Sequence, residues 1–174
     1  SLRHLAEAVG QPLDAWLHPY EVRLGDGRVF RFGVQLCEDM WCQDYCRAGE
    51  TIDTLALYYQ RGAEAVFNLS SSPWTWQKND KRNRVVREIL KRSPLPFFYA
   101  NQVGSQNNGK NIIVFDGDST AYGPDGEVVR RAEPWREQLL LTSGDTGVAS
   151  AQSESEARYM GILTGLRHLD YLRG

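Results

Sequence analysis

The residues best suited to chemistry follow directly on an apolar stretch of the chain. Residues 29–36 are rich in apolar and β-branched side chains and follow a Gly-Asp-Gly turn, which predicts a buried strand. Cys37, Glu38 and Asp39 come next, at the strand end where open α/β sheets place ligands and catalytic groups. A thiolate is a strong nucleophile, so we predict that Cys37 is catalytic; the alternative is a buried cysteine that only fills space.

A second polar stretch is predicted to reach the same edge of the sheet. Residues 52–59 carry an apolar helical stripe that Thr51 can cap, and residues 65–69 read as the next buried strand. A strand, helix, strand order implies parallel pairing. The segment Ser70-Ser71-Ser72-Pro73 should therefore lie near Cys37.

The remaining pattern predicts an α/β protein with a mixed sheet. Residues 1–9 have helical spacing, and a second helix is expected to begin at Asn79 or Asp80 and to end before Ser93-Pro94. Further strands are predicted at 96–100, 112–115, 120–122, 128–129 and 139–141.

The C-terminal part of the sequence changes character. Residues 143–155 are rich in small and polar residues without periodicity, which is typical of a linker or of a surface loop, and residues 156–174 carry an apolar helical stripe. We therefore predict a domain over 1–142, a linker over 143–155 and the beginning of a second domain at 156–174.

The amino-acid composition and charge of the chain favour some classes of protein function over others. The chain has 174 residues, 41% of them hydrophobic, and a formal net charge of -2 with interspersed signs, which favours a globular metabolic protein over a nucleic-acid binder. No apolar run is long enough for a membrane span, and three cysteines do not make a disulfide framework, so we expect a cytoplasmic protein. The spacing of Cys37, Cys42 and Cys46 does not match a paired zinc site, and we predict no metal here.

Two motifs carry a resemblance to a known family. Gly33-Val34-Gln35-Leu36-Cys37-Glu38-Asp39-Met40-Trp41 and Asn68-Leu69-Ser70-Ser71-Ser72-Pro73 resemble the nitrilase, or carbon-nitrogen hydrolase, superfamily, and more narrowly the glutaminase domain of glutamine-dependent NAD synthetases. The resemblance implies a nitrilase-like α-β-β-α sandwich, of which residues 1–142 would be the C-terminal half. It also implies that residues 156–174 are the first helix of the synthetase domain.

The resemblance also implies roles for individual residues. Cys37 would attack the side-chain amide of glutamine, release ammonia and leave a thioester that water hydrolyses. Glu38, Ser72 and Lys78 would hold the α-amino and α-carboxylate groups of glutamine, with Arg82 as the alternative anion partner.

The family's general base, a glutamate, and its oxyanion lysine precede the cysteine. No lysine precedes Cys37 in this sequence, and Glu7 and Glu21 lie in no recognisable family motif. We therefore expect a fragment that is inactive alone, tends to associate as a homo-oligomer, and needs no cofactor within this segment; deamido-NAD, ATP and magnesium would bind the synthetase domain. The alternatives are a free-standing amidase acting on another amide and a non-catalytic fragment that only folds and associates.

Overall fold

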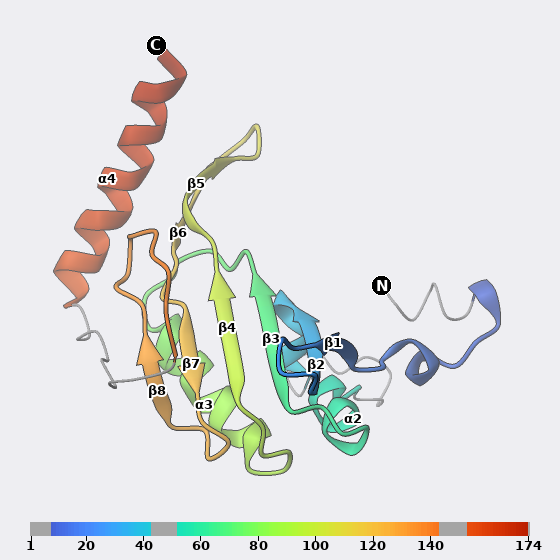
Figure 1. Cartoon of the computed structure of the whole chain (residues 1–174). Coiled ribbons are helices and arrows are strands. Elements are labelled where there is room, and N and C mark those ends of the chain that lie inside the picture. Colours follow the sequence, from blue (N-terminus) through green and yellow to red (C-terminus); the bar gives the residue numbers. More distant parts are fainter. Residues whose placement is uncertain (1–7, 43–51, 143–152, 174) are drawn as a thin grey trace.

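The computed structural model describes residues 8–42, 52–142 and 153–173. Its centre is a six-stranded mixed sheet with the order β1-β2-β3-β4-β7-β8 (Figure 1). The strands are β1 (Tyr20–Arg23), β2 (Val29–Leu36), β3 (Ala65–Ser70), β4 (Phe97–Asn101), β7 (Thr120–Tyr122) and β8 (Val128–Arg131). Strands β2, β3 and β4 are parallel and the outer pairs are antiparallel, which confirms the predicted α/β class with a mixed sheet.

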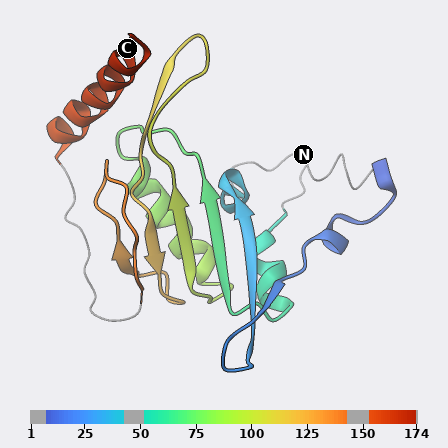
Figure 2. The same ribbon diagram turned by 45° about the horizontal axis from the view of Figure 1, so that its top comes forward.

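Helices α2 (Thr54–Gln60) and α3 (Lys78–Leu90) cover one face of this sheet (Figures 1 and 2). Helix α2 begins where the Asp53 side chain accepts a hydrogen bond of 3.0 Å from the Ala56 N–H; the predicted cap, Thr51, lies outside the described residues. The core between the helices and the sheet is apolar and includes Leu55, Tyr58, Val66, Val86, Ile89, Leu90 and Phe97.

Close packing of α2 on β2 requires a glycine. A Cβ atom at Gly33 would lie 2.4 Å from the ring of Tyr58, and the Tyr58 hydroxyl donates to the Val34 carbonyl at 2.9 Å. The helix therefore sits directly on the strand that ends at Cys37.

The opposite face of the sheet is apolar and open to solvent. Ring stacking runs across neighbouring strands, with ring centroids 5.6 Å apart for Phe32 and Phe67 and 5.0 Å apart for Phe67 and Phe98. Leu36 and Leu69 on this face are 63% and 50% exposed. The described residues thus form one helix layer packed on one face of the main sheet.

Two elements stand apart from the main sheet. Strands β5 (Val103–Asn107) and β6 (Ile112–Asp116) form a separate hairpin, and helix α4 (Glu154–Arg173) packs against it. Gly161 brings α4 close to the hairpin base, because a Cβ atom there would lie 3.6 Å from Trp135 and 3.7 Å from Trp74. The apolar stripe of α4 faces away and is exposed at Tyr159, Ile162, Leu166 and Leu169.

Two predicted elements differ from those observed, and one observed strand was not predicted. Helix α3 begins at Lys78, not at Asn79 or Asp80, because Gln77 adopts a left-handed conformation (φ 61°) that turns the chain into the helix. Residues 139–141 form no strand, since they pair with no strand of the described residues and Leu139 is 86% exposed. Strand β5 was not predicted, because its polar sequence lacks the apolar alternation of a strand.

The remaining elements include two short 3-10 helices, η1 (Leu13–Trp16) and η2 (Cys37–Trp41). The predicted helix over residues 1–9 and the predicted linker lie mostly outside the described residues. The predicted division of the chain into two domains stays a prediction.

Candidate active site

Cys37 lies at the sharp turn between β2 and η2. Its backbone is left-handed, with φ 40°, a conformation that costs a residue with a Cβ atom about 1–2 kcal/mol. Such strain is typical of functional sites, where the surrounding structure enforces it. The half-buried thiol is therefore carried at the end of a central strand, as predicted from the sequence.

The two carboxylates after Cys37 have different surroundings. The Asp39 carboxylate accepts a hydrogen bond of 2.8 Å from the Leu36 N–H, and burial raises the pKa of this carboxyl group. Asp39 therefore closes the turn around Cys37. Glu38 is exposed and free to meet a ligand.

Ser72 follows β3 at the same edge and is held through its backbone. The Ser72 N–H donates to Asn101 Oδ1 at 2.9 Å, and Asn101 Nδ2 donates to the Ser72 carbonyl at 3.3 Å. The Ser72 residue is only 7% exposed, and its hydroxyl has no hydrogen-bond partner among the described residues. A fixed backbone with an unused hydroxyl is a suitable contact for a polar ligand.

Lys78 reaches the same place from the first residue of α3. Its Nζ donates to the Pro73 carbonyl at 3.0 Å. Burial lowers the pKa of Lys78, while the neighbouring charges of Cys37, Asp116 and Glu38 act in the opposite direction. The structure thus brings Cys37, Glu38 and Lys78 within electrostatic reach of one another.

Arg82 lies one turn further along α3, and its side chain is held by contacts within the protein. Its guanidinium is 2% exposed, pairs with Asp118 at 2.6 Å and lies 4.0 Å above the ring of Tyr99. Arg131 binds the second oxygen of the same carboxylate. Its role as an alternative substrate partner stays a prediction, and in this structure the guanidinium is already occupied.

Sequence reasoning missed two amide side chains behind the site. Asn68 on β3 is completely buried and Asn101 on β4 is half-buried. An asparagine inside an apolar strand pattern was the available signal, because such a side chain must find partners when it is buried.

Of the two upstream glutamates, the described residues include Glu21, which lies far from Cys37. Glu21 lies on β1 opposite Arg31 of β2 and pairs with it at 2.8 Å. Because Arg31 precedes Cys37 by six residues, Glu21 lies about 20 Å from Cys37 along the strand direction. Glu7 lies outside the described residues.

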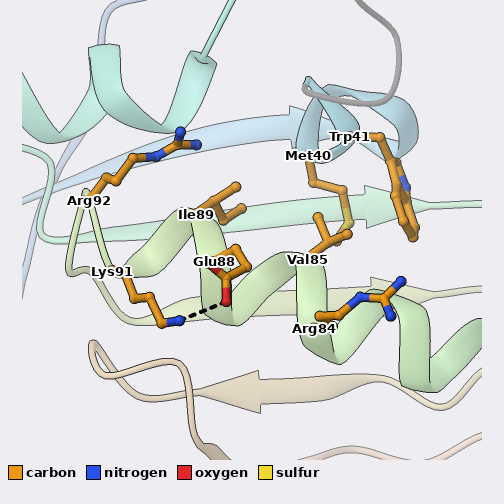
Figure 3. Close-up of a pocket in the computed structure, with 8 residues that line it drawn as sticks. All are labelled: Met40, Trp41, Arg84, Val85, Glu88, Ile89, Lys91 and Arg92. Atoms are coloured by element: carbon orange, nitrogen blue, oxygen red, sulfur yellow. Dashed lines mark hydrogen bonds and ion pairs between the residues drawn. The ribbon is translucent and has the colours of Figure 1, made fainter.

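A larger cavity lies on the other side of η2. This helix pocket, of about 440 Å³, is formed by η2 and α3 and is lined by Met40, Trp41, Arg84, Val85, Glu88, Ile89, Lys91 and Arg92 (Figure 3). Lys91 pairs with Glu88 at 2.7 Å, and Arg92 pairs with Asp53 at 3.3 Å. No cysteine or serine side chain lines this pocket.

Within 8–42, 52–142 and 153–173, no three His, Cys, Asp or Glu side chains are grouped to hold a metal ion. Cys46, the third cysteine of the local cluster, lies outside these ranges. No helix in the described part of the chain is long and apolar enough to cross a membrane.

Known proteins resemble this chain in sequence and in fold. The model of the family described as Carbon-nitrogen hydrolase matches residues 2–152. A glutamine-dependent NAD(+) synthetase from Synechocystis is 33% identical over 118 residues, covering 66% of this chain and 20% of that protein. One from Rhodobacter capsulatus is 30% identical over 151 residues, covering 81% of this chain and 25% of that protein.

Two further relatives extend the comparison. The structure of a glutamine-dependent NAD+ synthetase from Acinetobacter baumannii, in complex with ADP, aligns with a TM-score of 0.66 and 25% identity, covering 89% of this chain and 28% of that one. An N-carbamoylputrescine amidase from Arabidopsis thaliana is 23% identical over 163 residues, covering 87% of this chain and 52% of that protein. The chain therefore spans only a quarter or less of the length of the synthetases matched by sequence.

Proposed function

The chain belongs to the carbon-nitrogen hydrolase family, and we propose that it is the nucleophile-bearing part of a glutamine-dependent NAD synthetase. One observation carries this proposal. Cys37 stands in a strained left-handed turn at the end of a central strand, with the cation of Lys78 and the carboxylate of Glu38 beside it. A nucleophile with a cation and an anion near it suits an amide substrate whose other end is a zwitterion.

The proposed reaction begins with attack on the amide. The thiolate of Cys37 adds to the side-chain amide carbon of glutamine, and the tetrahedral intermediate collapses as the carbon–nitrogen bond breaks. The leaving nitrogen takes the proton that a general base removed from the thiol, and departs as ammonia. Water then hydrolyses the thioester to glutamate and free thiol.

The proposed substrate contacts divide by charge. Lys78 and the Ser72 hydroxyl hold the α-carboxylate, and Glu38 holds the α-ammonium, because charge-assisted hydrogen bonds are the strongest available for such groups. Arg82 is the alternative partner of the carboxylate, and it would first have to leave Asp118.

The general base and the oxyanion lysine would come from the rest of a longer protein. The matched synthetases are four to five times as long as the matched segment, and no lysine precedes Cys37 here. The open aromatic face of the sheet supports the same proposal, because a second sheet packed there would bury Phe32, Phe67 and Phe98. In that longer, cytoplasmic protein the ammonia would amidate deamido-NAD, with ATP and magnesium bound beyond this segment.

The same open face leads us to propose that the chain associates when it is alone. Exposed apolar sheet faces and edges favour self-association. Sedimentation velocity should show homo-oligomers whose population falls with Leu69→Lys, whereas Lys110→Glu on the hairpin should leave it unchanged. A monomer at all concentrations would contradict this expectation.

The test of function uses the full-length protein that contains this chain. Cys37→Ala should abolish NAD synthesis from glutamine and preserve synthesis from free ammonia, because the thiol serves amide hydrolysis alone. Cys42→Ala is the matched control and should retain both activities. Loss of both activities in Cys37→Ala, with the fold intact, would overturn the assigned role.

A second candidate is a free-standing amidase acting on another amide. It is favoured by the match to N-carbamoylputrescine amidase, which extends over 87% of this chain. Assaying ammonia release from glutamine and from N-carbamoyl amines separates the two, since only a glutaminase prefers a substrate with an α-carboxylate.

A further inference from the structure

The backbone of Cys37 is held by a buried side chain from the neighbouring strand. Asn68 on β3 is completely buried, and its Nδ2 donates to the Cys37 carbonyl over a long distance of 3.4 Å. This bond joins two parallel strand ends at Cys37, where φ is 40°, a value that is unfavourable for a residue with a Cβ atom.

The Asn68 amide is itself fixed by a chain of buried polar groups. Its Nδ2 also donates to Gln35 Oε1 at 3.4 Å, and its Oδ1 accepts from the Ser70 hydroxyl at 2.7 Å. Gln35 Nε2 in turn donates to Thr54 Oγ1 on α2 at 2.7 Å. Both donors and the acceptor of the amide are therefore used, so the amide cannot turn without leaving a buried polar group unpaired.

We propose that Asn68 is a positioning residue for Cys37. Its fixed amide holds the Cys37 carbonyl and so keeps the nucleophile in the left-handed turn that aims the thiol at the strand-end site. Asn68 acts through Cys37 and is separate from the proposed substrate contacts Glu38, Ser72 and Lys78. The kinetic test of this role rests on the proposed function, because it measures glutamine hydrolysis. The labelling test depends only on the position of the Cys37 thiol.

The kinetic test uses the full-length protein and separates turnover from binding. In Asn68→Ala, kcat for glutamine should fall by about 10²-fold, the size expected when a reacting group is misplaced by about 1 Å, while KM stays within about twofold. Asn83→Ala is the matched control, because this change also removes a part-buried hydrogen bond, which the Tyr122 hydroxyl donates to Asn83 Oδ1 at 2.6 Å, and Asn83 makes no hydrogen bond to Cys37. Its kcat should not change.

Two milder substitutions keep the proposal testable if Asn68→Ala does not fold. Ser70→Ala removes only the donor to Asn68 and should lower kcat by about 2- to 10-fold. Ser71→Ala, the same change one residue later, removes a bond to Gln102 and should leave kcat unchanged.

A chemical readout is independent of the substrate. Iodoacetamide labelling of Cys37, divided by that of Cys42 in the same molecule, should fall about fivefold or more in Asn68→Ala, because a released turn no longer keeps the thiol at the strand end. If glutamine is not hydrolysed by the parent protein but this ratio falls, the proposed function fails and the positioning role stands. An unchanged ratio and an unchanged kcat in folded Asn68→Ala and Ser70→Ala would overturn the positioning role.

Discussion

The two sides of the short helix η2 (Cys37–Trp41) present very different surroundings. At its beginning, Cys37 lies in a polar corner where neighbouring strand ends are tied together by the Asn68 and Asn101 amides. At its end, Met40 and Trp41 line the helix pocket of about 440 Å³, whose rim is charged (Figure 3).

The difference teaches what marks a site in this fold. The polar corner combines backbone strain, a half-buried lysine with a lowered pKa and buried amides whose partners are fixed. The helix pocket has volume and apolar walls, and its charged side chains are paired with one another or exposed. We therefore expect constraint on individual groups to indicate the chemistry better than cavity volume does.

The largest expected effect tests whether the polar corner around Cys37 contains every group that catalysis needs. We predict that this chain alone has no measurable glutaminase activity, because it would lack a general base, worth about 10²–10⁴-fold, and an oxyanion cation, worth about 10²–10³-fold. Ammonia release by the purified chain, compared with the full-length protein, measures this. Turnover that approached the full-length rate and vanished in Cys37→Ala would mean that the corner already holds its own base.

The next effect tests whether the helix pocket is part of the core. Met40 is 1% exposed, so Met40→Ala should lower the free energy of unfolding by about 2–5 kcal/mol, as measured by urea denaturation of this chain. Met40→Leu conserves volume and should cost less than about 1.5 kcal/mol. A negligible cost for Met40→Ala would indicate an empty ligand site.

A smaller effect distinguishes Lys78, near Cys37, from Arg84, at the rim of the helix pocket. In the full-length protein, Lys78→Ala should raise KM for glutamine by about 10- to 100-fold, since it removes a hydrogen bond to a charged group. Arg84→Ala, in the rim of the helix pocket, is the matched control and should change KM by less than about twofold. Equal effects of the two variants would remove the distinction between the sites.

The smallest expected effect is the titration of Lys78. Because burial lowers its pKa below the ordinary 10.5, the neutral and reactive amine appears at lower pH than in a free lysine side chain. Reductive methylation followed by mass spectrometry across pH 7 to 11 should place the Lys78 midpoint below that of a lysine peptide. A midpoint at or above the peptide value would show that the ammonium is stabilised by its neighbours.

The sequence predicted the framework of this fold because its signals were local. The apolar run before Cys37 and the helix and strand that follow it gave the parallel β2–β3 pair, and the same logic brought Ser72 to the sheet edge. These features depend on periodicity and turn residues, which can be read along the chain.

The sequence could not reveal features that depend on distant partners. Three examples are the hydrogen bonds of the Asn68 and Asn101 amides and the ion pair between Arg82 and Asp118. They join residues that are 29 to 36 positions apart, and no local sequence pattern predicts them. Residues 139–141 show the converse, because an apolar pattern forms no strand when no neighbouring strand is there to pair with it.

The central claim is that Cys37 is the nucleophile, and covalent labelling tests it most directly. Full-length protein treated with an electrophilic glutamine analogue, digested and examined by mass spectrometry should carry the label on Cys37 alone, and excess glutamine should protect it. Labelling confined to Cys42 or Cys46, or labelling that glutamine does not prevent, would contradict the account.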